Sequence, residues 1–412
     1  MKKIISLLLV VLMAAGLLAC GGGGQNGNIE TSGTETQTPD ASASETAAAP
    51  PDGGADTPAV SADAPQNVGY IDDPVDHFAR DTYQIAYLSP AFMFLQQSWF
   101  AAMQAFEERL NFKVTSFTGE NNSDTYLTNI ELIASQGYDG IIMDCEQPVA
   151  VRAYEIIEET GVPYIAFVQS LLDENGKTVC PQVVLDQYDT GKKTIDWLIA
   201  NYKSYWGEID ASTLGLIDCT VTTSPDLALR AVAPEEIFKA TFPEGHYFMA
   251  DMAAAGGVTA DAAYTQVMAT VSAHPEIEHW WVTGSTEFFG SGSARVFDDL
   301  GKVDDALVCV VGAGANIVDW DSMTPDTKSS LVACLAISDL LYAAPAVSGV
   351  IALIDGRATK ETLWRDKTPA DWQFGTDYGV WLVENDIITR DTYKTYFEEI
   401  NAKYLLSGGH TD

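Results

Sequence analysis

The chain has 412 residues, a formal net charge of -36 and a hydrophobic content of 47%. So large a negative charge excludes nucleic acid and polyanionic substrates as partners, and it also disfavours adsorption of the protein surface to an anionic membrane. The sequence beyond residue 82 is longer than one hydrophobic core usually holds, so we expect two lobes.

The N-terminus has the pattern of an export signal. Lys2 and Lys3 precede an apolar run over residues 4–13, and small residues then lead to Cys20. The run is too short to cross a bilayer, whereas a basic start and a small-residue cleavage site are typical of a secretory signal peptide. Cleavage before Cys20 would leave its thiol and amine free for acyl chains that anchor a protein durably. We therefore predict a lipoprotein signal peptide over residues 1–20, lipidation at Cys20 and an extracytoplasmic location on the cell surface or in the periplasm. The alternative is a signal peptide cut beside a chance cysteine.

Residues 21–80 consist largely of Gly, Ser, Thr, Ala, Pro and acidic residues. Such a segment buries too little apolar area to offset its ordering entropy, so we predict a disordered acidic tether. After Cys20, five cysteines remain, which is an odd number. Three of them, Cys219, Cys309 and Cys334, stand in apolar runs where a free cysteine behaves as a small hydrophobe. We expect no disulfide framework and no metal site, because no CxxC motif or Cys/His cluster is present.

Strand and helix patterns alternate from residue 83 onward. Strands are predicted at residues 83–88, 112–117, 140–143, 162–167 and 181–185, with amphipathic helices between them. A second series starts with a helix near residues 190–202. Its predicted strands are 214–217, 247–249, 280–282, 307–311 and 330–336, followed by helices at 338–355 and 389–404. Repeated strand–helix–strand units of this spacing imply an α/β fold of doubly wound parallel sheets.

Several segments together resemble the type I solute-binding proteins of bacterial sugar ABC importers. They are residues 89–94, 129–143, 149–165, 185–191 and 310–314, and the Gln-Gly-Tyr-Asp-Gly-Ile-Ile run at 136–142 is the most specific. The resemblance implies two Rossmann-like lobes joined by a hinge with three crossings. The N-terminal lobe would span 82–186 and be completed by about 337–375, the C-terminal lobe would span 187–336, and a tail at 376–412 would pack on the lobes. The crossings would fall near 186–187, near 312–320 or the strand that follows, and near 355–364.

In open parallel sheets, ligands bind beyond the carboxyl ends of the strands. The residues that follow the predicted strands are aromatic, hydroxyl-bearing, amide-bearing or acidic. From them we predict a ligand site made of Phe92, Phe94, Gln96, Asp144, Glu146, Gln169, Thr222, Ser285, Thr286 and Asn316.

The resemblance also exposes departures from the family pattern. Where sugar-binding relatives carry an Asp-Arg pair, an Asn-Asp pair and a further Asp, this chain has Val168-Gln169, Ser285-Thr286 and Gly314, and Leu335 takes a usually polar position. The site therefore offers fewer charged acceptors at these positions than a typical monosaccharide site.

Each candidate has a structural alternative. Asp144 and Glu146 favour the N-terminus of the helix that starts near Pro148, and Ser285 and Thr286 suit helix N-caps. Phe92 and Phe94 fit either ligand contact or packing. Four further residues are assigned away from the ligand: Trp99 and the Trp280-Trp281 pair to the core, and Arg230 to a surface ion pair, with a place in the cleft as the alternative for Arg230.

No nucleophile elbow, zinc-protease motif, P-loop or dinucleotide fingerprint occurs, so we predict that the protein is not an enzyme and uses no cofactor. The resemblance implies a monomer that captures a small, sugar-like ligand and delivers it to an ABC permease. Two alternatives stay open: a lipoprotein of the same fold that signals to a membrane receptor or kinase, and a binder of a nucleoside or aromatic solute.

Overall fold

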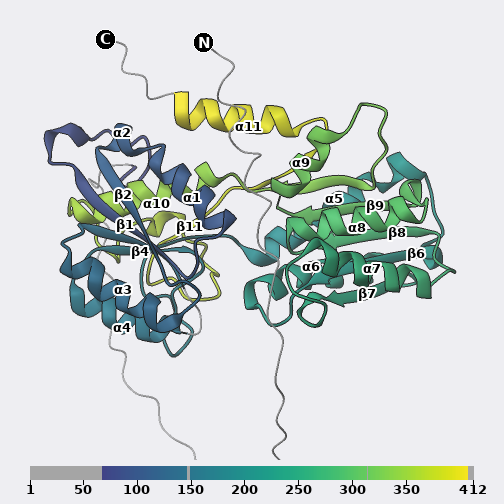
Figure 1. Ribbon diagram of the computed structural model, residues 1–412, viewed down its shortest axis with the longest axis horizontal. Helices are drawn as coiled ribbons and strands as arrows, with labels where there is room; N and C mark the ends of the chain where they lie inside the picture. The colour runs from purple at the N-terminus through teal and green to yellow at the C-terminus, as the bar shows by residue number, and fades with distance from the viewer. Residues whose placement is uncertain (1–66, 146–148, 313, 407–412) are drawn as a thin grey trace, which may run out of the picture. The chain divides into compact units, whose positions relative to one another are not determined.

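The computed structural model describes residues 67–145, 149–312 and 314–406. The predicted signal peptide, Cys20, most of the predicted tether and Glu146 lie outside these residues. Within them the chain forms two six-stranded sheets, each with helices on both faces (Figure 1). The predicted α/β fold of two doubly wound lobes is confirmed.

The first sheet has the order β11-β5-β4-β3-β1-β2, and all of its strand pairs are parallel. Its strands are β1 (Tyr83–Ser89), β2 (Phe112–Thr118), β3 (Gly140–Asp144), β4 (Tyr164–Val168), β5 (Gln182–Val184) and β11 (Val380–Leu382). Helices α1 (Phe94–Gln104) and α10 (Asp339–Ile354) cover one face, and α3 (Ser123–Ser135) and α4 (Ala150–Thr160) cover the other. The short helix α2 (Glu107–Leu110) precedes β2.

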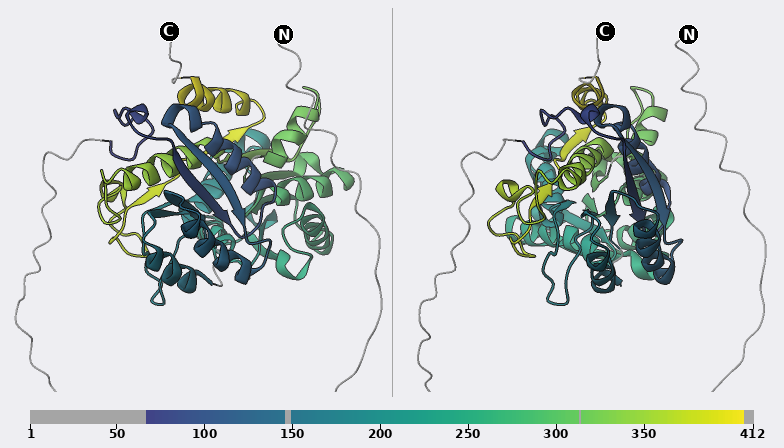
Figure 2. Two further views of the ribbon diagram at one scale, coloured as in Figure 1. Left: turned by 60° about the vertical axis from the view of Figure 1, so that its left-hand side comes forward. Right: turned by 90° about the vertical axis from the view of Figure 1, so that its left-hand side faces the viewer.

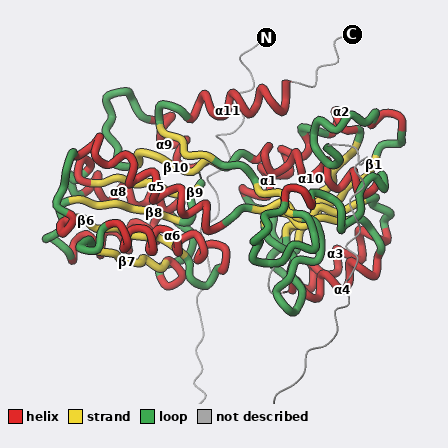
Figure 3. The backbone as a smooth tube through the Cα atoms, turned by 180° about the vertical axis from the view of Figure 1, so that it is seen from behind, coloured by secondary structure: helices red, strands yellow, loops and turns green. Residues whose placement is uncertain are grey.

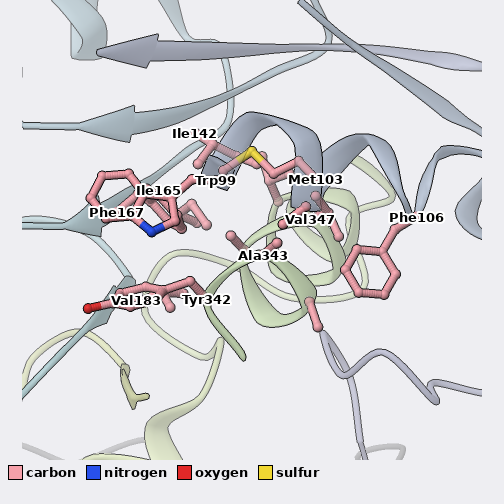
Figure 4. Close-up of a cluster of buried hydrophobic side chains, with 14 of the residues drawn as sticks. Trp99, Met103, Phe106, Ile142, Ile165, Phe167, Val183, Tyr342, Ala343 and Val347 are labelled. Carbon is pink, nitrogen blue, oxygen red and sulfur yellow. The ribbon is translucent and has the colours of Figure 1, made fainter. Parts of the chain in front are cut away.

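Side chains of the first sheet alternate between two apolar cores, as the strand period requires. On β1, Ile85 and Tyr87 face the core beneath α1 and α10, whereas Ala86 and Leu88 face the core beneath α3 and α4. Figure 4 shows the first of these cores, in which the ring of Trp99 meets that of Phe167 edge to face at 5.7 Å. The assignment of Trp99 to the core is confirmed.

The second sheet has the order β12-β10-β9-β8-β6-β7, with only the edge strand β12 antiparallel among its described pairs. Its strands are β6 (Leu214–Thr220), β7 (His246–Asp251), β8 (His279–Gly284), β9 (Ala306–Val311), β10 (Leu331–Ala336) and β12 (Asp386–Thr389). Helices α5 (Gln187–Trp206) and α6 (Pro225–Thr241) cover one face, and α7 (Ala260–Ala273) and α8 (Glu287–Asp299) cover the other. Trp280 and Trp281 lie in opposite cores, both fully buried, which confirms their predicted role.

The chain passes between the sheets three times, as can be followed in Figure 3. It crosses from β5 to α5 at residues 185–186, from β10 to α10 at 337–338, and from β11 to β12 at 383–385. The first lies at the predicted place; the second lies not at 312–320 but directly after β10, the strand that was the other predicted place. The third, predicted near 355–364, is wrong, because Leu363 and Trp364 belong to the first lobe's core. Strands β11 and β12 are three and four residues long, too short for a periodic pattern to reveal.

The predicted tether ends earlier than residue 80. Val68, Tyr70 and Ile71 pack against the first lobe's core, and the carbonyl of Gly69 accepts hydrogen bonds from the hydroxyl of Ser348 at 2.9 Å and from the indole of Trp364 at 3.2 Å. These few apolar residues make no pattern in the sequence. They become ordered because α10 and the loop after it offer a buried surface and two donors.

The segment predicted as a C-terminal tail first contributes β11 and β12 to the two sheets and then forms α11 (Tyr393–Asn401) and a π-helical turn (Ala402–Leu406). Tyr393 lies in a core of the second lobe, Ile400 lies in a core of the first, and Tyr396 packs against both. Helix α11 therefore contacts both lobes (Figure 2).

Among the described residues, the cysteines at 145, 180, 219, 309 and 334 are buried and carry free thiols. The described helices include none that is both long and apolar enough to traverse a bilayer. The remaining helix, α9 (Gly314–Ser322), follows β9.

Candidate functional site

Asp144 ends β3 and is only 2% exposed. Its Oδ1 has no hydrogen-bond partner within the described structure. Burial raises the pKa of Asp144 to about 7, and the negative charge of Asp226 on α6 adds to the rise. A hydrogen bond from the side chain of Gln96, in the first turn of α1, lowers the pKa and so opposes the rise. The strand end thus presents a carboxyl group that is close to its titration point at neutral pH.

Two residues of α10 belong to the same region: Tyr342 interacts with Asp144, and Asp339 interacts with Tyr342. Asp339 is the first residue of the helix, directly after the second crossing, and Tyr342 lies one turn later. Burial raises the pKa of Asp339 to about 6; a hydrogen bond from Ser98 of α1 counteracts this, and the charge of Glu287 contributes to it. The fully buried Tyr87 of β1 interacts with both Asp144 and Asp339, and its side chain also forms a hydrogen bond with that of Ser89.

Arg230 of α6 is the cation that the second lobe places near these carboxyl groups. Its Nε donates to the Oε1 of Gln187 at 2.7 Å, and its Nη1 donates to the carbonyl oxygen of Ser285 at 2.8 Å. Burial lowers the pKa of Arg230, whereas Tyr342 and Asp226 oppose that shift. The prediction of a surface ion pair is therefore wrong. Arg230 ties the start of α5 to the carboxyl end of β8, because α5 and α6 approach closely at Gly191.

The turn from β8 into α8 brings three more polar side chains. Ser285 is 2% exposed, and neither its hydroxyl nor that of Thr286 has a hydrogen-bond partner within the described structure. Thr286 occupies the N-cap position of α8, but its side chain makes no cap hydrogen bond. Glu287, the first residue of α8, is 9% exposed and interacts with Asp339. Hydroxyls that are buried but unused within the chain are available to a ligand.

These residues form one group that we call the inter-lobe polar cluster. It joins Asp144, Asp339, Tyr342 and Tyr87 of the first lobe to Asp226, Arg230 and Glu287 of the second. The four acidic residues lie at the carboxyl end of a strand or in the opening turn of the helix that follows one. Tyr87 lies within β1, and Arg230 and Tyr342 lie one turn further along α6 and α10. The arrangement can bind a small polar ligand through both lobes at once.

The structure brings together only part of the set predicted from sequence. Gln96 and Asp144 belong to the cluster's first-lobe side, and Ser285 accepts from Arg230 on the second-lobe side. Phe92 and Phe94, 36% and 62% exposed, stand at the entry to α1. Gln169 follows Val168, whose φ of 67° is rare for a β-branched residue and marks strain at the end of β4.

Two predicted residues are occupied within the protein itself. Thr222 hydrogen-bonds Asp251 through both its amide and its hydroxyl. Asn316 is fully buried; its Nδ2 donates to the carbonyl of Gly312 at 3.2 Å, and its Oδ1 accepts from the hydroxyl of Ser291 at 3.5 Å. Both side chains fix the turns in which they stand. Glu146 lies outside the described residues.

Sequence reasoning missed Tyr87, Asp226, Arg230, Glu287, Asp339 and Tyr342 as members of the site. Asp226, Glu287 and Asp339 each stand in the opening turn of a helix that follows a strand, so extending the strand-end rule by a few residues would have found them. Tyr87 and Tyr342 gave no signal, because each fits the apolar pattern of its own element.

Two doubly wound lobes, three crossings and polar side chains at the carboxyl ends of both sheets define the type I periplasmic binding protein fold. The chain belongs to this family, since the model of the periplasmic binding protein domain matches residues 89–327.

Solved structures of several other proteins share this fold. A 5-methylthioribose transporter solute-binding protein from Thermotoga lettingae is 20% identical, covers 80% of this chain and 94% of its own, and has a TM-score of 0.56. A Bacillus halodurans ABC transporter solute-binding protein with bound myo-inositol is 12% identical, with coverages of 77% and 98% and a TM-score of 0.58. An arabinose-binding protein from Geobacillus stearothermophilus is 14% identical, with coverages of 77% and 99% and a TM-score of 0.58. No curated protein matches the sequence.

Proposed function

We propose that this protein is an extracytoplasmic solute-binding component of an ABC importer, held at the membrane by lipid on Cys20. It captures a small, polar, sugar-like ligand between its lobes and delivers it to the permease; it is a monomer and catalyses no reaction. The observation that carries this proposal is the inter-lobe polar cluster, to which both lobes contribute. The ligands named for the similar structures, 5-methylthioribose, myo-inositol and arabinose, are all polyhydroxylated and agree with such a site.

The mechanism rests on groups that the protein leaves unpaired. The Oδ1 of Asp144 can accept a ligand hydrogen, and the hydroxyl of Ser285 can both donate and accept. A ligand that bonds groups of both lobes binds most tightly when those groups are brought together. Its differential affinity therefore shifts the population towards the closed form, which a permease can recognise by shape.

Gln169→Ala and Phe94→Ala should each weaken ligand binding by about 1 kcal/mol or more, because Gln169 after β4 offers a polar contact and Phe94 at the start of α1 offers an aromatic surface. Isothermal titration calorimetry checks both. Gln136→Ala, at the end of α3, and Phe78→Ala, 59% exposed near the N-terminal edge of the first lobe, are matched controls that should keep wild-type affinity. Unchanged affinity in both site variants would place the ligand elsewhere.

The function is tested by a thermal-shift screen of the full-length protein with saccharides, polyols, nucleosides and aromatic acids. A ligand that binds only the folded state raises the free energy of unfolding, by about 2.7 kcal/mol at a ligand concentration one hundred times Kd. The temperature of the unfolding midpoint rises with it. A saccharide or polyol that stabilises the protein supports the proposal. Stabilisation by nucleosides or aromatic acids alone would favour the alternative of an aromatic solute. The exposed rings of Phe92 and Phe94 could stack on such a solute. If none of these classes of compound stabilises the protein, the proposed function is contradicted.

Transport is separated from sensing by the ligand's fate. If the protein serves an importer, deleting its gene should abolish uptake of the labelled ligand by whole cells. Loss of a ligand-induced transcriptional response with uptake intact would instead favour the signalling alternative.

A further inference from the structure

We infer that the ligand carries a positively charged nitrogen, so that the inter-lobe polar cluster recognises an ammonium-bearing polar solute such as an amino sugar rather than a neutral sugar. This inference rests on the proposed function and narrows its ligand class.

The first observation is the balance of charge within the cluster. Its described members include the carboxyl groups of Asp144, Asp226, Glu287 and Asp339 against the single guanidinium of Arg230. That guanidinium is already directed at Gln187 and at the carbonyl of Ser285 by hydrogen bonds of 2.7 and 2.8 Å. The acidic groups therefore outnumber the cation available to them.

Three of these acids have an ordinary structural explanation. Asp226, Glu287 and Asp339 stand in the first turns of α6, α8 and α10, where the helix dipole favours a negative charge. Their presence at those positions alone would not require a ligand. They contribute to the inference only because two of their interactions cross between the lobes, that of Asp226 with Asp144 and that of Glu287 with Asp339.

Asp144 is the second, independent observation. It ends a strand, it is 2% exposed, and its Oδ1 has no hydrogen-bond partner in the described structure. Beside it stands Tyr87, at 0% exposure, whose side chain interacts with those of Ser89 and Asp144. Leaving a buried carboxylate oxygen unpaired is costly, so the site is incomplete without an additional donor.

The chemistry of the missing donor follows from what closure does to the acids. A neutral hydroxyl would supply a hydrogen, but it would bury several carboxylates further without balancing their charge. An ammonium supplies three N–H donors together with the opposite charge, and charge-assisted hydrogen bonds of this kind are about twice as strong as neutral ones. Aromatic rings also attract cations, and Phe92 and Phe94 stand at the entry of the helix that carries Gln96 and Ser98.

The titration of the cluster supplies a signature. Burial raises the pKa of Asp144 to about 7 and that of Asp339 to about 6, and it also raises the pKa of Asp226. The groups that face these carboxyls are Tyr87 of β1, Gln96 and Ser98 of α1, Tyr342 of α10, Arg230 of α6 and Glu287 of α8. A bound cation favours the charged carboxylates, so its affinity must rise as the pH increases through about 6 to 7. A neutral ligand lacks this charge-driven rise.

The experiment compares compounds on one hexose frame with the full-length protein. Glucosamine is the cationic member, glucose and N-acetylglucosamine are neutral, and glucuronate is anionic; arabinose, myo-inositol and two non-sugar amines, agmatine and putrescine, complete the set. Thermal shift selects the binders, and calorimetry at about pH 5.5, 6.5 and 7.5 measures Kd. We expect an amine to bind at least about tenfold more tightly than its neutral and anionic counterparts, with affinity that increases over this pH range.

Each outcome has a distinct meaning. A neutral or anionic sugar that binds as tightly as the amines overturns the cation inference and leaves the proposed function intact. Binding of agmatine or putrescine alone supports the inference of a cationic ligand. It would also show that the ligand in the proposed function is not a sugar. No binding by any member overturns the proposed function, and this inference with it.

Asp144→Asn identifies the responsible group, because it keeps the shape of the side chain and removes its charge. It should weaken amine binding at about pH 7.5 by at least about tenfold and flatten the pH dependence. Asp226→Asn, on the other lobe, tests the same idea should the first variant fold poorly, and Asp326→Asn, on an exposed loop, is the matched control. Wild-type amine affinity in both cluster variants would overturn the inference.

Discussion

At about pH 8, the substitution Asp218→Asn is expected to raise the free energy of unfolding by up to about 4 kcal/mol. Asp218 lies in β6 at 1% exposure, where its Oδ1 accepts a hydrogen bond from Thr283 at 2.9 Å and its Oδ2 accepts one from Tyr247 at 3.4 Å. Burial, aided by the charge of Glu235 on α6, raises the pKa of Asp218 from 3.8 to about 7 against the effect of both hydrogen bonds. Since one pKa unit corresponds to about 1.4 kcal/mol, this rise corresponds to roughly 4 kcal/mol.

The sign follows from proton binding. Between about pH 4 and 7 the folded protein holds a proton on Asp218 that the unfolded chain has released, so its contribution to stability falls as the pH increases through that window. Asparagine is neutral throughout; its Oδ1 can still accept from Thr283, and its Nδ2 can donate to the hydroxyl oxygen of Tyr247 in place of the bond that Asp218 accepts. Urea unfolding from about pH 4.5 to 8.5 should therefore show the two proteins nearly equal at the acidic end and the variant more stable at the alkaline end.

Other buried acids, Asp144 among them, tilt the wild-type curve in the same direction, but they are common to both proteins and cancel in the difference. Asp326→Asn, on an exposed loop, should leave the curve unchanged. Parallel curves for wild type and Asp218→Asn would show that Asp218 is charged within the folded lobe, and the account of its burial would be wrong.

The second large effect is expected at Gly191, where α5 meets α6. A Cβ at this position would lie 1.9 Å from the carbonyl oxygen of Arg230, which belongs to backbone that cannot give way as a flexible side chain can. Helix propensity alone would make Gly191→Ala stabilising by about 1 kcal/mol. We expect instead a loss of about 2 kcal/mol, because overpacking against a neighbouring helix costs about 1–3 kcal/mol and here strikes a main-chain atom.

The same substitution should also weaken ligand binding. Displacing α6 moves Arg230 away from Gln187 and Ser285, which it joins by two hydrogen bonds. Denaturant unfolding and calorimetry measure the two effects separately. Ala200→Gly, on the exposed side of α5, calibrates propensity in this helix and should cost about 1 kcal/mol without altering affinity. A Gly191→Ala protein more stable than wild type would refute the close approach.

Much of the architecture could be predicted because its signals are local. The alternation of Ile85, Ala86, Tyr87 and Leu88 between two cores, and the glycine that ends α4, are properties of neighbouring residues. Prediction failed where an element is too short to show a period. Strands β11 and β12, and the Val68–Ile71 segment, are ordered by partners far away in the sequence.

The site was predictable only to the extent that strand ends mark it. Asp144 was found in this way, and so were Gln96 and Ser285. Arg230 was misassigned because its partners, Gln187 and Ser285, lie 43 and 55 residues away. Conversely, Asn316 has the chemistry of a ligand contact, yet its amide is used by Gly312 and Ser291.

The sequence by itself determined the class of fold, the two lobes and the sheet edge at which polar groups gather, since hydrophobic periodicity and the rule for parallel strands act over short stretches of chain. Only the tertiary structure decided which of those polar groups remain available to a ligand. A side chain's hydrogen-bond partners and its desolvation depend on residues brought together by packing. Asp144 is left with an unpaired oxygen and a raised pKa, whereas Thr222 and Asn316 are already occupied by their neighbours.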